Sequence, residues 1–342
     1  MRLTPLATAA GLALTAATAA TLAARVSWFF DLFSHFRWQY VLLAGVTIPL
    51  LWKCGRRTLA LVSVAALCVH LYALSVQRFG PAVGSLSGGR PLRVVSLNVR
   101  YSNHDYAAVI GLVERESPDI VCLYETTPAW QENLAPLTRQ FAFALYTGNG
   151  PRSGLACMSR RKPARVVPPA GDGIAVPWMR LDYELDGATV AVFAAHLYMP
   201  VTPAGAARRN RQLEEFAEEL RVAARPTIAV GDFNLSPYSP HDRDFSAASG
   251  LRDCSRGRPL APTWPTRLAP LWIQIDRCFL SAGVGLARYG VGGALGSDHY
   301  PLLMDFMVGA RVWRPAGRGS NFGDGRRVNT ATSRPGPRGL TT

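Results

Sequence analysis

Three apolar segments occupy the first quarter of the chain. They are Thr4–Ala24, which carries no charge, Trp38–Trp52 and Thr58–Val76. The last two segments approach the roughly 20 residues that a helix needs to cross the hydrocarbon core of a bilayer, and they have Trp and Tyr near their boundaries. The pattern predicts a membrane anchor of two or three transmembrane helices within residues 1–79. The first segment also suits the apolar part of a signal peptide, and buried helices of a soluble protein are the less favoured alternative.

The cations between the last two segments predict the orientation of the chain in the membrane. Lys53-Cys54-Gly55-Arg56-Arg57 carries three positive charges in five residues, and such loops stay on the cytoplasmic side. Everything after about Gln77 is then expected outside the cytoplasm. Residues 80–92, rich in Gly, Pro and Ser, suggest a flexible linker, and residues 311–342 a disordered basic tail.

Residues 93–310 alternate short apolar runs with helical spacing and indicate one soluble domain. Strands are predicted at 93–99, 119–124, 154–159, 179–185, 189–196, 227–230, 275–280, 286–291 and 302–308, and helices at 106–115 and 203–224. Strands and helices are interleaved, and Asp186-Gly187 is a hairpin signal. The pattern therefore favours a mixed-sheet α/β sandwich over an all-parallel sheet.

The net charge of +14 lies almost entirely at the two ends of the chain. Residues 1–92 carry +7, residues 311–342 carry +6, and the soluble domain carries only +1. The high isoelectric point is therefore weak evidence for a basic groove that binds DNA.

Polar side chains recur where the apolar strands begin or end. They are Asn98, Glu125, His196, Asp232, Asn234, Asp276 and the pair Asp298-His299. One polar residue at a strand end is ordinary, but this many hydrogen-bonding or metal-binding groups suggest that one rim of the sheets is a reaction site. Glu125 can bind a hard cation such as Mg²⁺, and Asn98 can add a neutral oxygen or orient a metal-bound water.

The other polar residues suit phosphoester chemistry. Asp232 and Asn234 are two positions apart, so on an extended segment both side chains would point to the same side. His299 is the best candidate for a general base, because histidine titrates nearest to neutrality.

Three further side chains complete this set. Asp276 could orient the His299 ring, and His196 could donate a hydrogen bond to a phosphoryl oxygen. Asp298 could contact a metal or polarise the site. Each residue also has an ordinary explanation: a turn, a helix cap, or for Asp276 an ion pair with Arg277.

The motifs in their order resemble the endonuclease/exonuclease/phosphatase (DNase I-like) superfamily, and more narrowly its membrane-tethered bacterial branch. They are Leu97-Asn98-Val99-Arg100, Glu125, Gly154–Arg160, His196, Gly231-Asp232-Phe233-Asn234, Ile275-Asp276-Arg277 and Gly296–Leu302, with Thr263–Thr266 for the narrower likeness. The resemblance covers residues 93–310. It implies a four-layer α/β sandwich with two mixed β-sheets and hydrolysis of a phosphoester with Mg²⁺, or Mn²⁺ in its place.

The resemblance also implies a role for each residue. Glu125 becomes a metal ligand with Asn98 beside it, and Asp232 and Asn234 hold the nucleophile and the phosphate; His299, Asp276 and His196 keep the roles given above. Tyr124 stands where the family often has Gln, and the basic side chains of the DNA-cutting members are not evident.

The leading hypothesis is thus a membrane-anchored, metal-dependent phosphoester hydrolase: a phosphodiesterase, phosphatase or nuclease. One alternative is an enzyme of the phospholipid or sphingomyelin phosphodiesterase type, and another is a non-catalytic binding protein that has kept the fold. Outside the cytoplasm a disulfide between Cys254 and Cys278 is chemically permitted, and we take that pairing as a hypothesis. Cys122 and Cys157 fall in predicted core strands.

Overall fold

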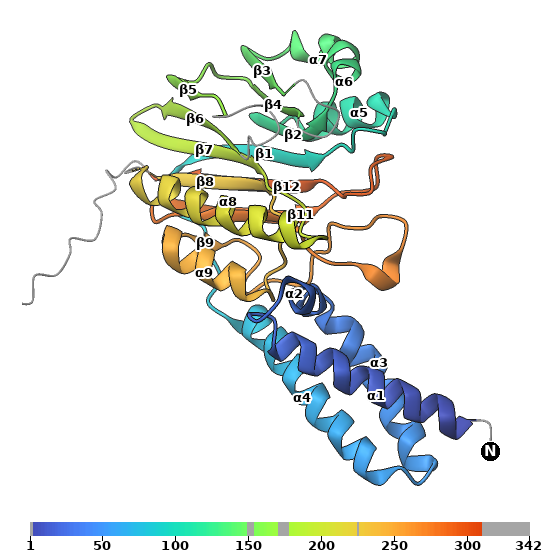
Figure 1. The fold of residues 1–342 in the computed structure, drawn as a ribbon. Helices are drawn as coiled ribbons and strands as arrows, with labels where there is room; N and C mark the ends of the chain where they lie inside the picture. Colours follow the sequence, from blue (N-terminus) through green and yellow to red (C-terminus); the bar gives the residue numbers. More distant parts are fainter. Residues whose placement is uncertain (1–2, 149–153, 170–177, 224–225, 310–342) are drawn as a thin grey trace, which may run out of the picture.

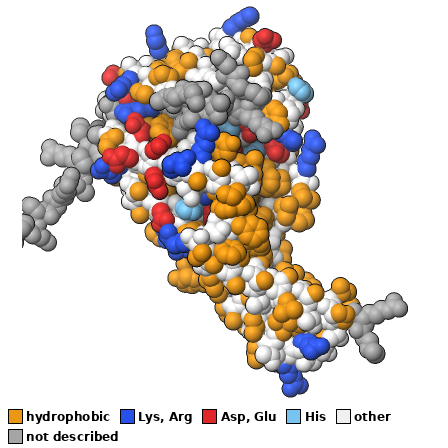
Figure 2. Space-filling model, viewed as in Figure 1, with side chains coloured by type: hydrophobic (Ala, Val, Ile, Leu, Met, Phe, Trp, Pro, Cys, Tyr) orange, Lys and Arg blue, Asp and Glu red, His pale blue; other side chains and the backbone are white. Residues whose placement is uncertain are grey.

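The computed structural model describes residues 3–148, 154–169, 178–223 and 226–309. The predicted tail, residues 311–342, lies outside them. Figure 1 shows two parts, an α/β sandwich and a bundle of long helices that projects from one end of it. Charged side chains are scattered over the visible face of the sandwich, whereas hydrophobic side chains dominate the bundle and the neck between the two parts (Figure 2).

The bundle is built by the apolar segments of the first 79 residues. Its helices are α1 (Leu3–Leu22), α3 (Arg37–Lys53) and α4 (Arg57–Phe79), and the short helix α2 (Trp28–Ser34) lies between α1 and α3. Among the described residues, α1 and α4 are long and apolar enough to cross a membrane, whereas α3 has 17 residues. Only 22% of the apolar window of α1 and of α4 is buried. These helices therefore expose most of their apolar surface, unlike the core helix of a soluble domain.

The sandwich contains two six-stranded mixed sheets. The first has the order β11-β12-β1-β2-β4-β3, in which β1 and β2 are parallel and the other neighbours antiparallel. Its strands are β1 (Arg90–Asn98), β2 (Ile120–Thr126), β3 (Phe143–Thr147), β4 (Gly154–Ser159), β11 (Val284–Val291) and β12 (Leu302–Val308).

The second sheet repeats this plan. Its order is β5-β6-β7-β8-β10-β9, in which β7 and β8 form the parallel pair. Its strands are β5 (Arg165–Val167), β6 (Trp178–Leu185), β7 (Ala188–His196), β8 (Thr227–Asp232), β9 (Arg252–Asp253) and β10 (Asp276–Leu280).

Strand alternation sorts the apolar side chains into three layers. On β7, Val190 and Val192 pack between the two sheets, whereas Ala191 and Phe193 pack outward under helices. The helices α5 (Tyr106–Glu116), α6 (Pro128–Asn133) and α7 (Ala135–Thr138) cover the first sheet, and α8 (Pro203–Val222) and α9 (Pro240–Ser249) cover the second. The predicted four-layer sandwich with two mixed sheets, as in DNase I, is confirmed.

Several local predictions differ from the structure. The stretch 80–92 is not linker throughout, because β1 begins at Arg90 and Val83 is 1% exposed within the core between the sheets. The sequence pattern does not predict α2, α6, α7, α9, β3, β5 or β9. Most of these elements are short, and their apolar positions are set by tertiary packing rather than by a long periodic run.

The cysteines follow the hypothesis made from the sequence. Cys254 and Cys278 form a disulfide. Cys122 and Cys157 are free and buried on the adjacent strands β2 and β4, with their sulfur atoms 3.3 Å apart.

Candidate active site

The topology brings the predicted polar residues to one rim of the sandwich. Because β1 and β2 are parallel, as are β7 and β8, the carboxyl ends of all four strands lie at corresponding edges. The strands β12 and β10 are antiparallel to β1 and β8, so they begin where those strands end; Asp276 pairs directly with Asp232. Residues far apart in the chain therefore meet at this rim.

The Asn98 side chain joins the two sheets at the rim. Its Nδ2 donates to Glu125 Oε1 at 2.9 Å and to Asp232 Oδ2 at 3.0 Å. Its Oδ1 accepts from the backbone N–H of Arg100. Glu125 lies at a register shift of β2 with φ of 59°, and its Oε2 accepts from the Tyr101 N–H. Asn98 thus orients two carboxylates through its nitrogen. Its predicted role, to add a neutral oxygen ligand or to orient a metal-bound water, stays a prediction.

His299 and Asp276 form the pair that sequence analysis predicted. His299 Nδ1 lies 2.8 Å from Asp276 Oδ2, and its Nε2 lies 3.8 Å from Asp232 Oδ2. Two hydroxyls hold this pair in place. Ser297 Oγ accepts from the His299 N–H and donates to the Asn98 carbonyl, and Thr263 Oγ1 accepts from the Asp276 N–H.

The charges of the buried pair strongly affect its protonation. Burial alone would lower the pKa of His299, but the carboxylates of Asp276 and Asp232 outweigh it and raise that pKa to about 10. Burial raises the pKa of Asp232 to about 6, although His299 acts in the opposite direction. At neutral pH the isolated site therefore holds a protonated imidazole beside carboxylates, and a base role for His299 requires it to lose this proton.

His196 and Asp232 end neighbouring strands and lie together at the rim. His196 Nε2 is 3.8 Å from both Glu125 Oε1 and Asp232 Oδ2. The strands approach closely here: a Cβ at Gly231 would collide with the Ala195 carbonyl oxygen. Glycine is thus required immediately before Asp232.

The expected orientation of Asn234 is wrong. Asn234 has a φ of 48°, so the segment is not extended and the two side chains do not simply alternate. Its N–H donates to Asp232 Oδ1, which closes an Asx turn, and its Nδ2 donates to the Leu197 carbonyl. Asn234 thereby ties the end of β8 to the loop that follows β7.

Asp298 and Tyr124 lie beside the cluster rather than within it. Asp298 Oδ2 accepts from Trp264 Nε1 at 3.3 Å and lies 3.9 Å from Arg100. Its predicted contact with a metal stays a prediction. Tyr124 is buried between the sheets, where its hydroxyl bonds Ser96 and the Val230 carbonyl. Tyr124 thus joins the two sheets in the core behind the site.

Sequence analysis assigned no role to Ser297, Thr263 or Arg209. The serine could have been found, because a hydroxyl two residues before His299 commonly accepts the backbone N–H of such a turn. Thr263 belongs to the Thr263–Thr266 motif, but its bond to the Asp276 N–H is a tertiary contact that the motif alone does not indicate. Arg209 on α8 donates to the Asn234 carbonyl, which is likewise a tertiary contact.

Arg277 does not pair with Asp276, because alternation along β10 sends the two side chains to opposite faces. Its guanidinium is fully buried and lies 2.8 Å from Asp242 and 3.0 Å from Asp253. We expect Arg277→Met to lower the free energy of unfolding by about 3–5 kcal/mol, because two buried carboxylates lose their counterion. Denaturant titration in detergent micelles measures this loss.

The matched control is Arg288→Met, whose partly exposed pair with Glu116 should contribute less than about 1 kcal/mol. Equal losses in the two variants would contradict a buried ion cluster behind β10.

The rim residues fit a hard divalent cation. One amide nitrogen holds the Glu125 and Asp232 carboxylates together, and ligand atoms of Asp232, Asp276 and His299 lie within 4.8 Å of one another. Within the described part of the chain, no donor reaches the buried Asp276 Oδ1. Several hard oxygen atoms around a small volume suit Mg²⁺ or Mn²⁺ better than softer metals.

Fold and rim together define a DNase I-like α/β sandwich with an acidic, histidine-containing site at the strand ends. Residues 95–299 match the model of the endonuclease/exonuclease/phosphatase family, and the chain belongs to this family. No curated protein matches the chain.

Solved structures of the same fold include proteins of bacteria and animals. D. rerio TDP2 in complex with a single-strand DNA product has a TM-score of 0.54 and 17% identity, over 63% of this chain and 98% of that chain. The endonuclease/exonuclease/phosphatase of Beutenbergia cavernae has a TM-score of 0.52 and 20% identity, over 64% of this chain and 72% of that one. A family protein from Bacteroides thetaiotaomicron has a TM-score of 0.52 and 16% identity, over 64% and 98%.

Proposed function

We propose that the chain is a membrane-anchored phosphoester hydrolase that depends on a divalent cation. The observation that carries this proposal is the His299–Asp276 pair. The second ring nitrogen of His299 faces the rim where Asn98 joins Glu125 to Asp232. A base, an orienting carboxylate and a cluster of oxygen ligands are the parts that water attack on a phosphoester needs.

The chain's own residues divide the work as follows. Asp276 fixes the orientation of His299, and His299 Nε2 accepts the proton of the attacking water. His196, next to Glu125 and Asp232, donates a hydrogen bond to the charge that develops on the phosphoryl oxygens. Glu125 and Asp232, with Asn98 beside them, would hold the cation. When bound, this cation would supply positive charge that polarises the phosphoryl group and opposes the rise in the pKa of His299.

We propose a membrane location from the two apolar helices of the bundle, and we propose from the cationic turn alone that the site lies on the side away from the cytoplasm. The cationic turn Lys53–Arg57 lies between the ends of α3 and α4 that are far from the sandwich. The C-terminal ends of α1 and α4 and the N-terminal end of α3 adjoin the sandwich. If the cationic turn is cytoplasmic, the rim lies beyond the outer surface of the bilayer.

One loop favours a lipid phosphoester as the second, finer candidate function. Trp38 and Gln39, on the first turn of α3, both donate to the Trp272 carbonyl at 2.9 Å. The other end of that loop holds Trp264, which bonds Asp298 next to the base. Between these ends Leu268 and Leu271 are 50% and 40% exposed. The loop thus places apolar side chains between the rim and the end of the bundle that adjoins the sandwich.

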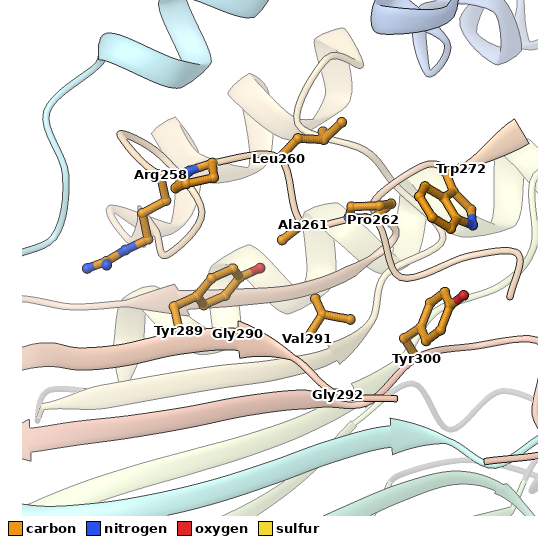
Figure 3. Close-up of a pocket in the computed structure, with 11 residues that line it drawn as sticks. Arg258, Leu260, Ala261, Pro262, Trp272, Tyr289, Gly290, Val291, Gly292 and Tyr300 are labelled. Atoms are coloured by element: carbon orange, nitrogen blue, oxygen red, sulfur yellow. The ribbon is translucent and has the colours of Figure 1, made fainter. Parts of the chain in front are cut away.

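The same region contains an apolar cavity of about 470 Å³. Trp272 and Tyr300 face one another at one end of it, and Tyr289 lies below the 258–262 segment (Figure 3). Tyr300 directly follows His299, so the cavity lies beside the proposed site. Its aliphatic walls fit an acyl chain, and its aromatic rings would also stack on a nucleobase, so the preference for a lipid rests on the exposed leucines of the loop.

A substrate panel tests both levels of the proposal. The full chain in proteoliposomes is given Mg²⁺ and either bis(p-nitrophenyl) phosphate, single- or double-stranded DNA, nucleotides, sphingomyelin or phosphatidylinositol phosphates. We expect turnover of the chromogenic diester and faster turnover of a lipid. Faster turnover of DNA would contradict the lipid assignment alone, and no turnover of any phosphoester would contradict the hydrolase.

The two exposed leucines provide a sharper test of the lipid assignment. We expect Leu268→Ser and Leu271→Ser each to lower lipid turnover roughly fivefold, which is the effect of losing part of one buried leucine, without changing turnover of the soluble diester. Val222→Ser, at the end of α8 away from the rim and 54% exposed, is the control. An equal loss of turnover on both substrates would mean that the leucines stabilise the fold and do not contact the lipid.

A further inference from the structure

The short helix α2 of the anchor contacts the loop that follows the Gly231–Asn234 motif. His35, at the C-terminal end of α2, lies 2.7 Å from Ser236 Oγ through its Nδ1. Asp31 Oδ1 accepts from Ser239 Oγ at 2.8 Å, and Ser239 is also the N-cap of α9. The anchor therefore bonds both ends of the short loop 236–239, directly after the proposed site.

A buried ion pair continues this contact into the site. Arg209 on α8 is 1% exposed, and its Nη2 lies 3.1 Å from Asp31 Oδ2, whose side chain is 3% exposed. The other amino group of Arg209 donates to the Asn234 carbonyl at 3.1 Å. Asn234 in turn binds Asp232 and the Leu197 carbonyl. A continuous chain of polar contacts thus runs from α2 to the rim.

The energetics make this pair different from an ordinary surface contact. A buried guanidinium without its counterion is strongly unfavourable, and the carboxylate that compensates Arg209 comes from a segment 178 residues away in the sequence. The Asp31 carboxylate and the Asn234 carbonyl share the planar guanidinium of Arg209 as donor, so the position of the ion pair sets the position of the carbonyl. A second contact between the bundle and the sandwich, the ion pair of Arg25 with Asp244, is exposed to solvent and involves none of the rim residues.

We propose that α2 is an integral part of the active site, in which Asp31 acts as a positioning residue that holds Asn234 and the loop 233–239 through Arg209. The inference rests on the proposed function for its catalytic consequence and for the membrane location of the bundle. The anchor then has two tasks: it holds the domain at the membrane, and it completes the scaffold of the site.

Hydrogen exchange on the full chain in detergent micelles tests the inference without any substrate. We expect Asp31→Asn to speed exchange at the backbone amides of residues 233–239, and Asp31→Glu to restore part of the protection. The control Asp244→Asn removes the exposed anchor contact and should leave this loop unchanged. Unchanged exchange in Asp31→Asn, or the same change in Asp244→Asn, would overturn the inference.

A second variant covers the case in which Asp31→Asn does not fold. Asp31→Leu combined with Arg209→Met removes both charges and keeps an apolar contact, which proteins often tolerate. We expect this variant to fold and still to lose protection in 233–239, because the Asn234 carbonyl has lost its donor. Full protection in the double variant would overturn the inference.

Activity adds a separate readout. If the wild type hydrolyses bis(p-nitrophenyl) phosphate, Asp31→Asn should lower kcat roughly 10- to 100-fold with little change in KM, since a misplacement of about 1 Å at a site has an effect of this size. An inactive wild type with an exchange result as expected would contradict the hydrolase and leave the positioning role intact. An active Asp31→Asn with wild-type kcat would contradict the positioning role alone.

Discussion

Replacing His299 with glutamine should lower kcat for a phosphodiester by about 10²–10⁴-fold, the range over which a positioned general base contributes. Glutamine keeps a polar side chain of similar reach but cannot accept the proton of water at neutral pH. The variant should still fold and bind Mg²⁺, because Ser297 and Thr263 hold the surrounding backbone. Initial rates at saturating Mg²⁺ measure the effect.

The matched control is His104→Gln, since His104 is exposed on a loop and its ring contacts only Tyr106 among the hydrogen bonds and ring contacts found in the described residues. We expect its rates to equal those of the wild type. A His299→Gln protein with full, metal-dependent activity would contradict the assignment of the base. Asp276→Asn should share the phenotype of His299→Gln, because Asp276 acts by orienting that ring.

Removal of the metal should have an effect at least as large. EDTA is expected to abolish hydrolysis, and added Mg²⁺ or Mn²⁺ to restore it. Glu125→Gln should raise the Mg²⁺ concentration for half-maximal activity by more than about tenfold, because a carboxylate that faces the rim loses its charge. Isothermal titration calorimetry with Mg²⁺ alone checks the same point without a substrate.

Glu132→Gln is the control for this series, since Glu132 is exposed on α6. It should leave the Mg²⁺ requirement unchanged. Activity that persists in EDTA after exhaustive dialysis would exclude the cation-dependent proposal, and unchanged Mg²⁺ affinity in Glu125→Gln would remove Glu125 from the binding site.

Much of the fold could be predicted because its strands are long, apolar and bounded by turn signals. β1, β7 and β12 each alternate between two packed faces, and this periodicity is visible in the sequence. Helix α2 was missed because it has seven residues. Its stability comes from contacts with α8 and the 236–239 loop, which no local pattern records.

The residues of the site also divide into those that the sequence pattern predicts and those that depend on tertiary contacts. Asn98, Glu125, His196, Asp232, Asp276 and His299 could be found because each begins or ends a recognisable strand, and the structure brings them to one rim. The orientation of Asn234 could not, because it depends on a left-handed backbone that local alternation does not predict. Arg209 lies on α8 and Asp31 on α2 of the N-terminal helical bundle, and only the tertiary fold joins them.

The most direct test of the central claim is hydrolysis in ¹⁸O-labelled water, followed by mass spectrometry of the products. The purified full chain is incubated with Mg²⁺ and bis(p-nitrophenyl) phosphate. Attack of a His299-activated water on phosphorus predicts one ¹⁸O atom in the phosphate product. It also predicts no turnover in EDTA, and label that accumulates about 10²–10⁴-fold more slowly in His299→Gln. Label found in the alcohol product, or a folded protein that binds Mg²⁺ and turns over no phosphoester, would contradict the account.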